Sequence, residues 1–437
     1  MYDTIIASKV KGQLASFMGK VFTHFSKPMA RFVHEMLYGI QASGDTQLSS
    51  IVRAIDDDIE PIYTEKRLSR NIDNKDLDKR VASAILAEGA AHVRKDTLVL
   101  IDPTEIRKEF GYKMEYVTRV RDARRSSKDG RDVLVNGYHG CMVAACTSGS
   151  RRTIPLALRL WSSRAPGHLG ENDEVLKILK DVFGATGGNG IAVYDRGGDR
   201  PAFYEYFINN GIAFIVRINS RSVLSWRGLH EVESLARQCT MQHTHHVVFD
   251  SHGQDCNVPI SFGTMPVRLP KFPDKQLHLV VVRGFGQQPM MILTSLDVDA
   301  SFKSQWRVVE GYLSRWRIEE TIRFIKQEYG FENMRVQSYN GIRNMASLVL
   351  AAAYFSTVWI GRHIKHKVLA DHLARLNKRL NEVPQFAAYA ITSGIKRAFS
   401  AFGRLVERVV DIIPAKKTNL PTQLMFEFVE YAEWCDG

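Results

Sequence analysis

Cysteine is scarce in this sequence and follows no framework spacing. The 437 residues include five cysteines, an odd number. They are Cys141, Cys146, Cys239, Cys256 and Cys435. Small secreted domains held together by disulfides are much richer in cysteine, usually in even number. The pattern therefore excludes a disulfide scaffold and indicates a reducing compartment.

Long apolar runs are also lacking. The longest apolar stretch spans residues 345–360 and is interrupted by Ser347, Ser356 and Thr357. It is too short and too polar to cross a bilayer, so it predicts a buried helix and no membrane partner. The N-terminal stretch MYDTIIASKVKGQLASFMGK has no continuous apolar segment and no small-residue cleavage site. These features predict a cytosolic protein.

Positive charge, in contrast, is plentiful. Lys and Arg number 59 against 47 Asp and Glu, a formal charge of +12. Hydrophobic residues make up 45% and charged residues 24%, which is ordinary for a globular protein and excludes a mainly disordered chain. A positive excess of this size favours a polyanionic partner, and nucleic acid is the commonest.

Residues 1–95 have the apolar periodicity of helices. RFVHEMLYGIQASGDTQLSSIVRAI predicts a helix, a break at Gly44 and a second helix that Asp45 or Thr46 caps, and EKRLSRNI predicts a third helix. Short helices joined by a tight polar turn are typical of a helix-turn-helix. The basic side chains expected to bind DNA here are Arg53, Lys66, Arg67 and Arg70. The alternative is a plain helical bundle with a solvated basic face.

Residues 96–220 alternate strands and helices in the order of a ribonuclease H-like core. Three strands (TLVLIDPTEI, DVLVNGYHGCMVAACT, RTIPLALRLWSS) precede a helix, a strand (GIAVYDRGGD), a helix and a strand (IAFIVRIN). Residues 221–303 predict a β-rich insertion, 304–365 a helix that completes the core, and 366–437 a helical C-terminal region. The expected fold class is α/β: a ribonuclease H-like mixed sheet flanked by helices, with this insertion and helical regions at both ends.

Two aspartates stand where core strands are expected to end. Asp102 closes the first strand and Asp195 closes the fourth. Ligands of open α/β sheets gather at such strand ends. For either residue alone, the alternative is an ordinary turn or helix-capping aspartate.

A third carboxylate comes from GYLSRWRIEETIRFIKQEYG, which predicts one amphipathic helix. At 100° per residue its polar residues fall within one arc about 60° wide. They are Tyr312, Arg315, Glu319 and Lys326. An apolar stripe that includes Ile318, Ile322 and Ile325 lies beside this arc, whereas Glu320 projects away from it. The alternative is a solvated face whose Arg315–Glu319 pair is an ordinary i,i+4 ion pair.

The spacing Y-x2-R-x3-E-x6-K resembles the YREK motif of DDE transposases of the insertion-sequence-four family. The resemblance extends to IDPTEI, to YDRGGDR, to the β-rich insertion and to the basic helical N-terminus with its KRLSR, and it covers most of the chain. It implies a DNA transposase that cuts at terminal inverted repeats and transfers a 3′-OH into target DNA by cut-and-paste transposition.

The resemblance also implies a metal site. Asp102, Asp195 and Glu319 would be both the catalytic residues and the ligands of Mg²⁺, with Mn²⁺ able to substitute. Hard cations of this kind prefer carboxylate oxygens, and two of them activate the attacking oxygen and stabilise the leaving oxygen of a phosphodiester. The implied partners are double-stranded DNA, as transposon ends and as target, and a second subunit in a synaptic homodimer. The implied location is the bacterial cytoplasm, at the nucleoid.

Further residues take DNA-handling roles by the same resemblance. Arg315 and Lys326 would hold phosphates beside the cleaved bond, Tyr312 would contact the terminal phosphate, and Arg196, which follows Asp195, would act similarly unless it is a plain surface arginine. Relatives that form DNA hairpins carry a tryptophan in the insertion. Here the corresponding stretch reads QQPMMILTSL and Trp306 lies elsewhere, so the hairpin route is not predicted.

Other features carry less weight. The spacings C-x3-H and H-x3-C within residues 239–256 would suit zinc but match no standard finger. The cluster comprises Cys239, His243, His245, His246, His252 and Cys256. Glu105 is an alternative metal ligand, and GATGGNG lacks the lysine of a phosphate-binding loop. Two other functions remain open: an inactive relative that only binds DNA ends, and a nuclease or paired-carboxylate glycosidase on the same fold.

Overall fold

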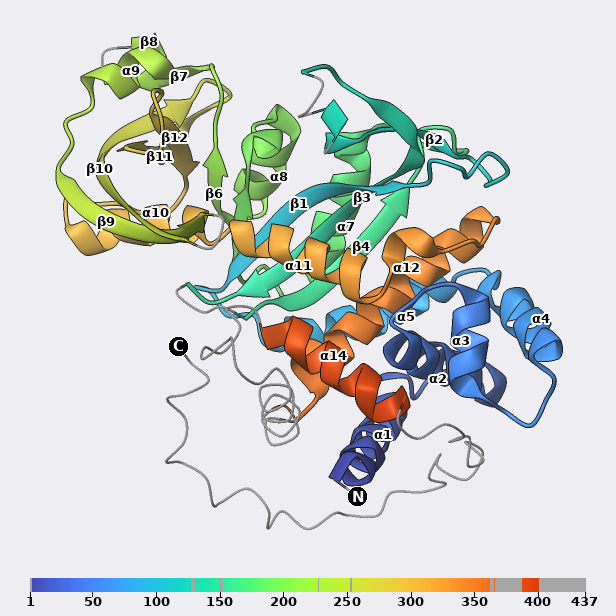
Figure 1. Ribbon diagram of the computed structural model, residues 1–437. Coiled ribbons are helices and arrows are strands. Elements are labelled where there is room, and N and C mark those ends of the chain that lie inside the picture. The colour runs from blue at the N-terminus through green and yellow to red at the C-terminus, as the bar shows by residue number, and fades with distance from the viewer. Residues whose placement is uncertain are drawn as a thin grey trace.

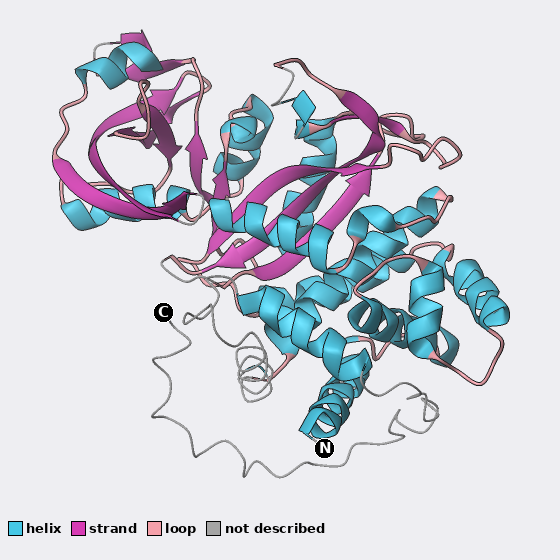
Figure 2. Cartoon of the chain, viewed as in Figure 1, coloured by secondary structure: helices cyan, strands magenta, loops and turns pink. Residues whose placement is uncertain are grey.

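The computed structural model describes residues 2–361, 365 and 387–400, apart from 124, 127–129, 149–151, 227 and 252–253. A mixed sheet runs through the molecule, with helices packed on it and a cluster of strands at one end (Figure 1, Figure 2). Of the expected C-terminal region 366–437, only helix α14, Ala387–Ser400, lies within the described residues.

Helices form the N-terminal part of the chain, as expected. Their bounds are α1 Tyr2–Val21, α2 Lys27–Ser43, α3 Leu48–Ile55, α4 Pro61–Ile72 and α5 Leu77–Ala90. Helix α2 is largely buried because Phe32, Met36 and Ile40 recur at intervals of four residues and face the core. It ends at Gly44, whose φ of 63° allows the left-handed turn toward α3. This break lies where the sequence predicts it.

The central part of the sheet has the order β4–β3–β1–β5–β6. Strand β3 is antiparallel to both β1 and β4, whereas β5 is parallel to β1 and β6 is parallel to β5. The bounds are β1 Leu98–Arg107, β3 Leu134–Cys146, β4 Ile154–Trp161, β5 Ile191–Tyr194 and β6 Ala213–Arg217, with helices α7 Glu171–Ala185 and α8 Pro201–Asn209 between the later strands. This arrangement confirms the expected mixed α/β fold and is consistent with a ribonuclease H-like core.

The sheet continues past β6 into the β-rich segment. Strand β12 pairs with β6, β11 with β12 and β10 with β11, while β9 and β7 both pair with β10. The bounds are β7 Ser222–Ser225, β8 Gly228–Glu231, α9 Val232–Gln238, β9 His243–Ser251, β10 Gln254–Leu269, β11 Phe272–Arg283 and β12 Met290–Thr294. Short strand β2, Thr118–Arg121, pairs with the beginning of β3 at the opposite end of the sheet (Figure 1).

Two local predictions are wrong. Strand β1 does not end at Asp102, because its pairing with β3 continues as far as Arg107. The expected single helix around Glu319 is two helices, α10 Phe302–Leu313 and α11 Trp316–Glu328. They are separated by a tight turn in which the Arg315 amide donates to the Tyr312 carbonyl three residues back. The hydroxyl of Ser314 donates a hydrogen bond to the Glu310 carbonyl at 2.8 Å, which favours this interruption.

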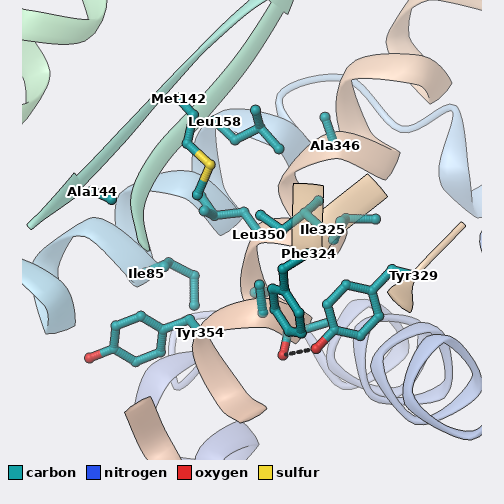
Figure 3. Packing of buried hydrophobic residues seen from close by; sticks show 14 of the residues in the cluster. Ile85, Met142, Ala144, Leu158, Phe324, Ile325, Tyr329, Ala346, Leu350 and Tyr354 are labelled. Atoms are coloured by element: carbon teal, nitrogen blue, oxygen red, sulfur yellow. Dashed lines mark hydrogen bonds between the residues drawn. The ribbon is translucent and has the colours of Figure 1, made fainter. Parts of the chain in front are cut away.

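Hydrophobic cores fill both faces of the sheet. One, around Val99, Ile101 and Phe207, lies under α7 and α8. The other lies under α11 and the buried helix α12, Tyr339–Tyr354. Figure 3 shows Phe324 and Ile325 of α11 in this second core, with Met142 of β3 and Leu350 of α12. The second core therefore fixes α11 against the sheet.

None of the described helices is both long enough and apolar enough to span a bilayer.

Candidate active site

Asp102 and Asp195 lie beside each other on neighbouring strands. Ile101 of β1 and Tyr194 of β5 are register partners in the parallel ladder; Asp102 is the next residue of β1, and Asp195 directly follows the last residue of β5. Adjacent strands are about 4.8 Å apart, so the two backbones at this level are one strand spacing apart. The two aspartates predicted from separate strand ends are therefore neighbours, although β1 itself runs on beyond Asp102.

Arg315 joins Asp102 to Glu319. Its Nη1 lies 3.4 Å from Oδ1 of Asp102, and its Nη2 donates to Oε1 of Glu319. The Arg315 and Asp102 side chains are only 17% and 16% exposed, whereas Glu319 is 49% exposed. One guanidinium thus connects the sheet to the first turn of α11, and the site opens to solvent on the Glu319 side.

Burial dominates the electrostatics of Asp102. It raises the pKa of this carboxyl to about 7, although the Arg315 guanidinium opposes the shift; the carboxylates of Glu319 and Asp195 add to it. A carboxylate in such a place is stabilised by a nearby cation. Within the described part of the chain, no three carboxylate, imidazole or thiol groups are already close enough together to hold a metal ion. The Arg315 guanidinium lies between the carboxylates of Asp102 and Glu319 and contacts both.

The other two motif residues do not join this group. Tyr312, in the last turn of α10, is buried, with 6% of its surface exposed. Lys326 donates to the backbone carbonyl of Glu105 at 2.6 Å and lies 3.7 Å from the Glu332 carboxylate. Burial lowers the pKa of the Lys326 ammonium, against the opposing effect of both acids. Lys326 therefore links α11 to β1 and to the segment after α11.

The sequence matches a known protein family over much of its length. The sequence model described as "Transposase DDE domain" matches residues 94–355, more than half of the chain. The protein belongs to this transposase DDE domain family. No curated protein matches the chain. The solved structure described as "piggyBac transposase synaptic complex with hairpin DNA" is similar to it with 11% sequence identity and a TM-score of 0.43, over 98% of this chain and 88% of that chain.

The loop that carries Asp195 in this DDE domain is held by a buried network that the sequence did not reveal. Oδ1 of Asp195 accepts from the Gly197 amide at 2.8 Å, and Arg196 is exposed. Four residues after Asp195, Asp199 lies 3.1 Å from Arg221 and accepts from the Tyr204 hydroxyl at 3.1 Å. The motif YDRGGDR contains both aspartates, but the partners of Asp199 lie in α8 and in the segment before β7, which no local pattern identifies.

The turn between α2 and α3 packs against the DDE domain. Thr46 donates its hydroxyl to the Gly330 carbonyl at 2.8 Å, and Asn333 donates to Asp45 at 3.3 Å. Asp45 does lie at the start of α3, where its carboxylate accepts from the Thr46 and Gln47 amides, while Gln47 is the capping position. The turn of the predicted helix-turn-helix is therefore a contact with the end of α11.

The four basic residues predicted to bind DNA differ in their surroundings. Arg53, Lys66 and Arg70 are exposed. Arg67 instead pairs with the buried Glu35 of α2 and lies 3.6 Å from Asp57. Residues 45–73 carry four Lys or Arg and seven Asp or Glu side chains. Residues 45–73 are therefore acidic overall. This net charge weakens the prediction that they bind DNA.

Two histidines of the cluster considered for zinc, within residues 239–256, make other contacts. His245 packs edge-on against Trp306 with 4.3 Å between ring centroids, and Nε2 of His243 lies 2.8 Å from the Ala300 carbonyl. Cys239 is a buried free thiol. His252 and the side chain of Cys256 lie outside the described residues, so the full predicted cluster is not compared with the structure.

Proposed function

We propose that this DDE-domain protein is a cut-and-paste transposase of the insertion-sequence-four type, cleaving DNA at terminal inverted repeats and joining the freed 3′-OH to target DNA. Family membership supports a transposase. The observation that carries the site assignment is that Asp102 and Asp195 are neighbours on two adjacent strands, while the half-buried Arg315 joins Asp102 to Glu319 in the first turn of α11.

The residues present fit a divalent cation. Asp102, Asp195 and Glu319 supply the carboxylate oxygens that Mg²⁺ or Mn²⁺ prefers, and burial of Asp102 makes its negative charge costly without a cation nearby. When bound, the metal ions would activate the attacking oxygen and stabilise the leaving oxygen of the phosphodiester. We assign these three residues as metal ligands and Glu105, whose backbone carbonyl binds Lys326, as a neighbour.

The chain's own cations orient the DNA. Arg315 is placed to move from the carboxylates to a phosphate when metal and DNA enter, and Arg196 is exposed beside Asp195 for the same purpose. Tyr312 is too buried to contact a terminal phosphate directly, so we assign it to support the turn between α10 and α11. Lys326 stabilises the position of α11 by binding the Glu105 carbonyl, and in the proposed complex it would hold a phosphate of the DNA strand.

The implied partners are double-stranded DNA at both ends of the element and at the target. Two ends require two active sites, so a homodimer in the synaptic complex is part of the proposal. The protein would act at the bacterial nucleoid.

The test compares two neighbouring glutamates of α11. Glu319→Gln should abolish cleavage and joining of DNA that carries the gene's flanking terminal repeats in Mg²⁺. Glu320→Gln is the matched control: this side chain pairs with Arg323 and accepts from the Tyr389 hydroxyl at 3.2 Å, away from Asp102. It should cleave and join DNA as the unmodified protein does.

Three results would reject the proposal or part of it. Equal loss of cleavage in Glu319→Gln and Glu320→Gln would reject the assignment of Glu319 as a metal ligand. End binding by the unmodified protein without any cutting would instead favour an inactive DNA-binding relative. Cutting without joining would favour a simple nuclease.

A further inference from the structure

We infer that strand β2 and the loops beside it form a second DNA-binding surface, which holds the phosphate backbone of duplex DNA about six base pairs from the cleaved bond. The inference rests on the proposed function only in placing that bond at Asp102. The β2 surface consists of Phe110, Tyr112, Lys113, Arg119, Arg121 and Arg164, all exposed.

Strand register puts the arginines of β2 on the same face of the sheet as Asp102. Asp102 pairs with Met142 of β3, Arg119 pairs with Asn136 and Arg121 pairs with Leu134. Side chains alternate along a strand, and these three positions of β3 differ by even numbers, so they share a face. Met142 and Asn136, which mark the levels of Asp102 and Arg119, are six residues apart along β3. Six residues of a strand span about 20 Å, which is close to the length of six base pairs at about 3.4 Å each. Ile325 of α11 and Phe331 pack on this face between the two sites, so a duplex with its cleaved bond at Asp102 would reach the β2 surface by passing over them.

Local charge at this end of the sheet suits a polyanion. Residues 107–132 carry nine Lys or Arg and five Asp or Glu side chains, in contrast to the acidic region 45–73. Several of the acids are already neutralised: Asp132 pairs with Arg121 at 2.7 Å, Glu109 with Arg125 at 2.9 Å and Asp122 with Arg107 at 3.3 Å. Within the described residues, no carboxylate forms an ion pair with Arg119 or Arg164. These two arginines bind carbonyl oxygens and leave further N–H groups for phosphate.

Two exposed aromatic rings stand beside the cations. Phe110 is 83% exposed and Tyr112 is 75% exposed, both at the tip of the loop between β1 and β2. The base of this loop is fixed, because the Glu115 amide donates to the Gln337 carbonyl at 2.8 Å and the Tyr138 hydroxyl donates to the Glu115 carbonyl at 2.6 Å. Exposed aromatic rings among cations are typical of surfaces that stack on bases or wedge between base pairs.

The fold holds the β2 surface together as one unit. The Thr118 and Ser163 hydroxyls are 2.7 Å apart, which ties β2 to the loop that carries Arg164. Arg164 itself donates to the Val117 carbonyl at 3.1 Å. Because these contacts already fix β2 and the loop of Arg164 relative to each other, binding would have to order mainly the side chains.

The experiment measures binding of the full-length protein to fluorescent duplex DNA of unrelated sequence by anisotropy, over a range of salt. The variant Arg119→Ala/Arg121→Ala/Arg164→Ala should bind at least about tenfold more weakly at about 0.05 M salt, and its plot of log affinity against log salt should be shallower by about 0.9 for each lost phosphate contact. Phe110→Ala/Tyr112→Ala should lose about fivefold or more in affinity with an unchanged salt slope.

Two matched variants separate charge from folding. Arg237→Ala/Lys271→Ala/Lys275→Ala removes three exposed cations from the far end of the sheet and should bind DNA as the unmodified protein does. Arg119→Lys/Arg121→Lys/Arg164→Lys keeps the charges and should restore most of the salt slope. If the lysine variant were as weak as the alanine variant, the arginines would act through folding and the inference would be wrong.

Two further outcomes decide the matter independently of cleavage. Equal affinity and equal salt slope for the alanine variant and the unmodified protein would overturn the β2 surface, even if DNA ends are cut normally. Failure of the unmodified protein to bind duplex DNA at low salt would overturn it as well. Loss of cutting in Glu319→Gln tests only the proposed function, because that variant keeps the β2 surface intact.

Discussion

Asp102 and Asp195 follow the paired residues Ile101 and Tyr194 at the same level of two parallel strands. The hydrogen-bonded ladder between β1 and β5 ends one residue before each aspartate, so it brings their backbones close together. Asp195 is further oriented by the Gly197 amide, which donates to its carboxylate at 2.8 Å. The strands thus bring the two aspartates together, and the rearrangement that a cation would require involves Arg315, which contacts Asp102.

Asp195→Asn is the sharpest test of this pair. The amide oxygen of asparagine can still accept from Gly197, so the loop should keep its shape while the negative charge is lost. We expect cleavage in Mg²⁺ to fall below detection and Mn²⁺ binding to weaken, with little change in melting temperature. Asp181→Asn, at a 59% exposed position on α7, is the control and should cleave normally. Normal cleavage by Asp195→Asn would remove this residue from the metal site.

On the proposed function, Arg315 would compete with a metal ion for Asp102 and Glu319, since one guanidinium contacts both. Arg315→Ala should therefore bind Mn²⁺ about five to thirty times more tightly in calorimetric titration without DNA, a gain of about 1–2 kcal/mol. Cleavage should nevertheless decrease, because a phosphate-binding group is lost. The Mn²⁺ affinity of Arg315→Lys should lie between those of Arg315→Ala and the unmodified protein. Unchanged metal affinity in Arg315→Ala would mean that the arginine is only structural.

Much of the site could be predicted because its residues lie on regular elements. Apolar strands ending near a carboxylate identified Asp102 and Asp195, and helical periodicity placed Glu319 beside the buried residues Ile318 and Ile325. The break at Ser314 was missed because the spacing from Tyr312 to Glu319 fits one helix as well as two joined by a turn. The hydrogen bonds of the turn, from the Ser314 hydroxyl to the Glu310 carbonyl and from the Arg315 amide to the Tyr312 carbonyl, reveal the difference.

Some contacts of the candidate site join residues that are far apart along the chain, and no local pattern shows them. Lys326, whose predicted role is to hold a phosphate, also donates to the carbonyl of Glu105, more than two hundred residues earlier. Asp199 was not noticed, because Arg221 and Tyr204 become its neighbours only when the chain folds. Periodicity reports which face of an element is buried and says nothing of which distant group it meets.

The contact between the α2–α3 turn and the end of α11 can be tested by stability. Thr46→Val keeps the shape of the side chain but leaves the buried Gly330 carbonyl without its donor. The free energy of unfolding should fall by about 1–3 kcal/mol in chemical denaturation. Thr244→Val, at an exposed position of β9, should change it by less than about 0.5 kcal/mol. If the two variants were equally stable, the turn would not be coupled to the DDE domain.

His34 of α2 should make stability depend on pH. Burial lowers the pKa of its imidazole to about 4, although the neighbouring Glu35 opposes the shift. In the unfolded chain the pKa returns to about 6.5, so between these values the unfolded state binds more protons and the free energy of unfolding decreases as pH falls. The full loss attributable to this residue is about 3 kcal/mol at most. His34→Gln, which cannot be protonated, should lose correspondingly less stability than the unmodified protein between about pH 6.5 and about pH 4.5 in urea denaturation. Parallel losses in the two proteins would show that His34 is not the group whose charging destabilises the fold.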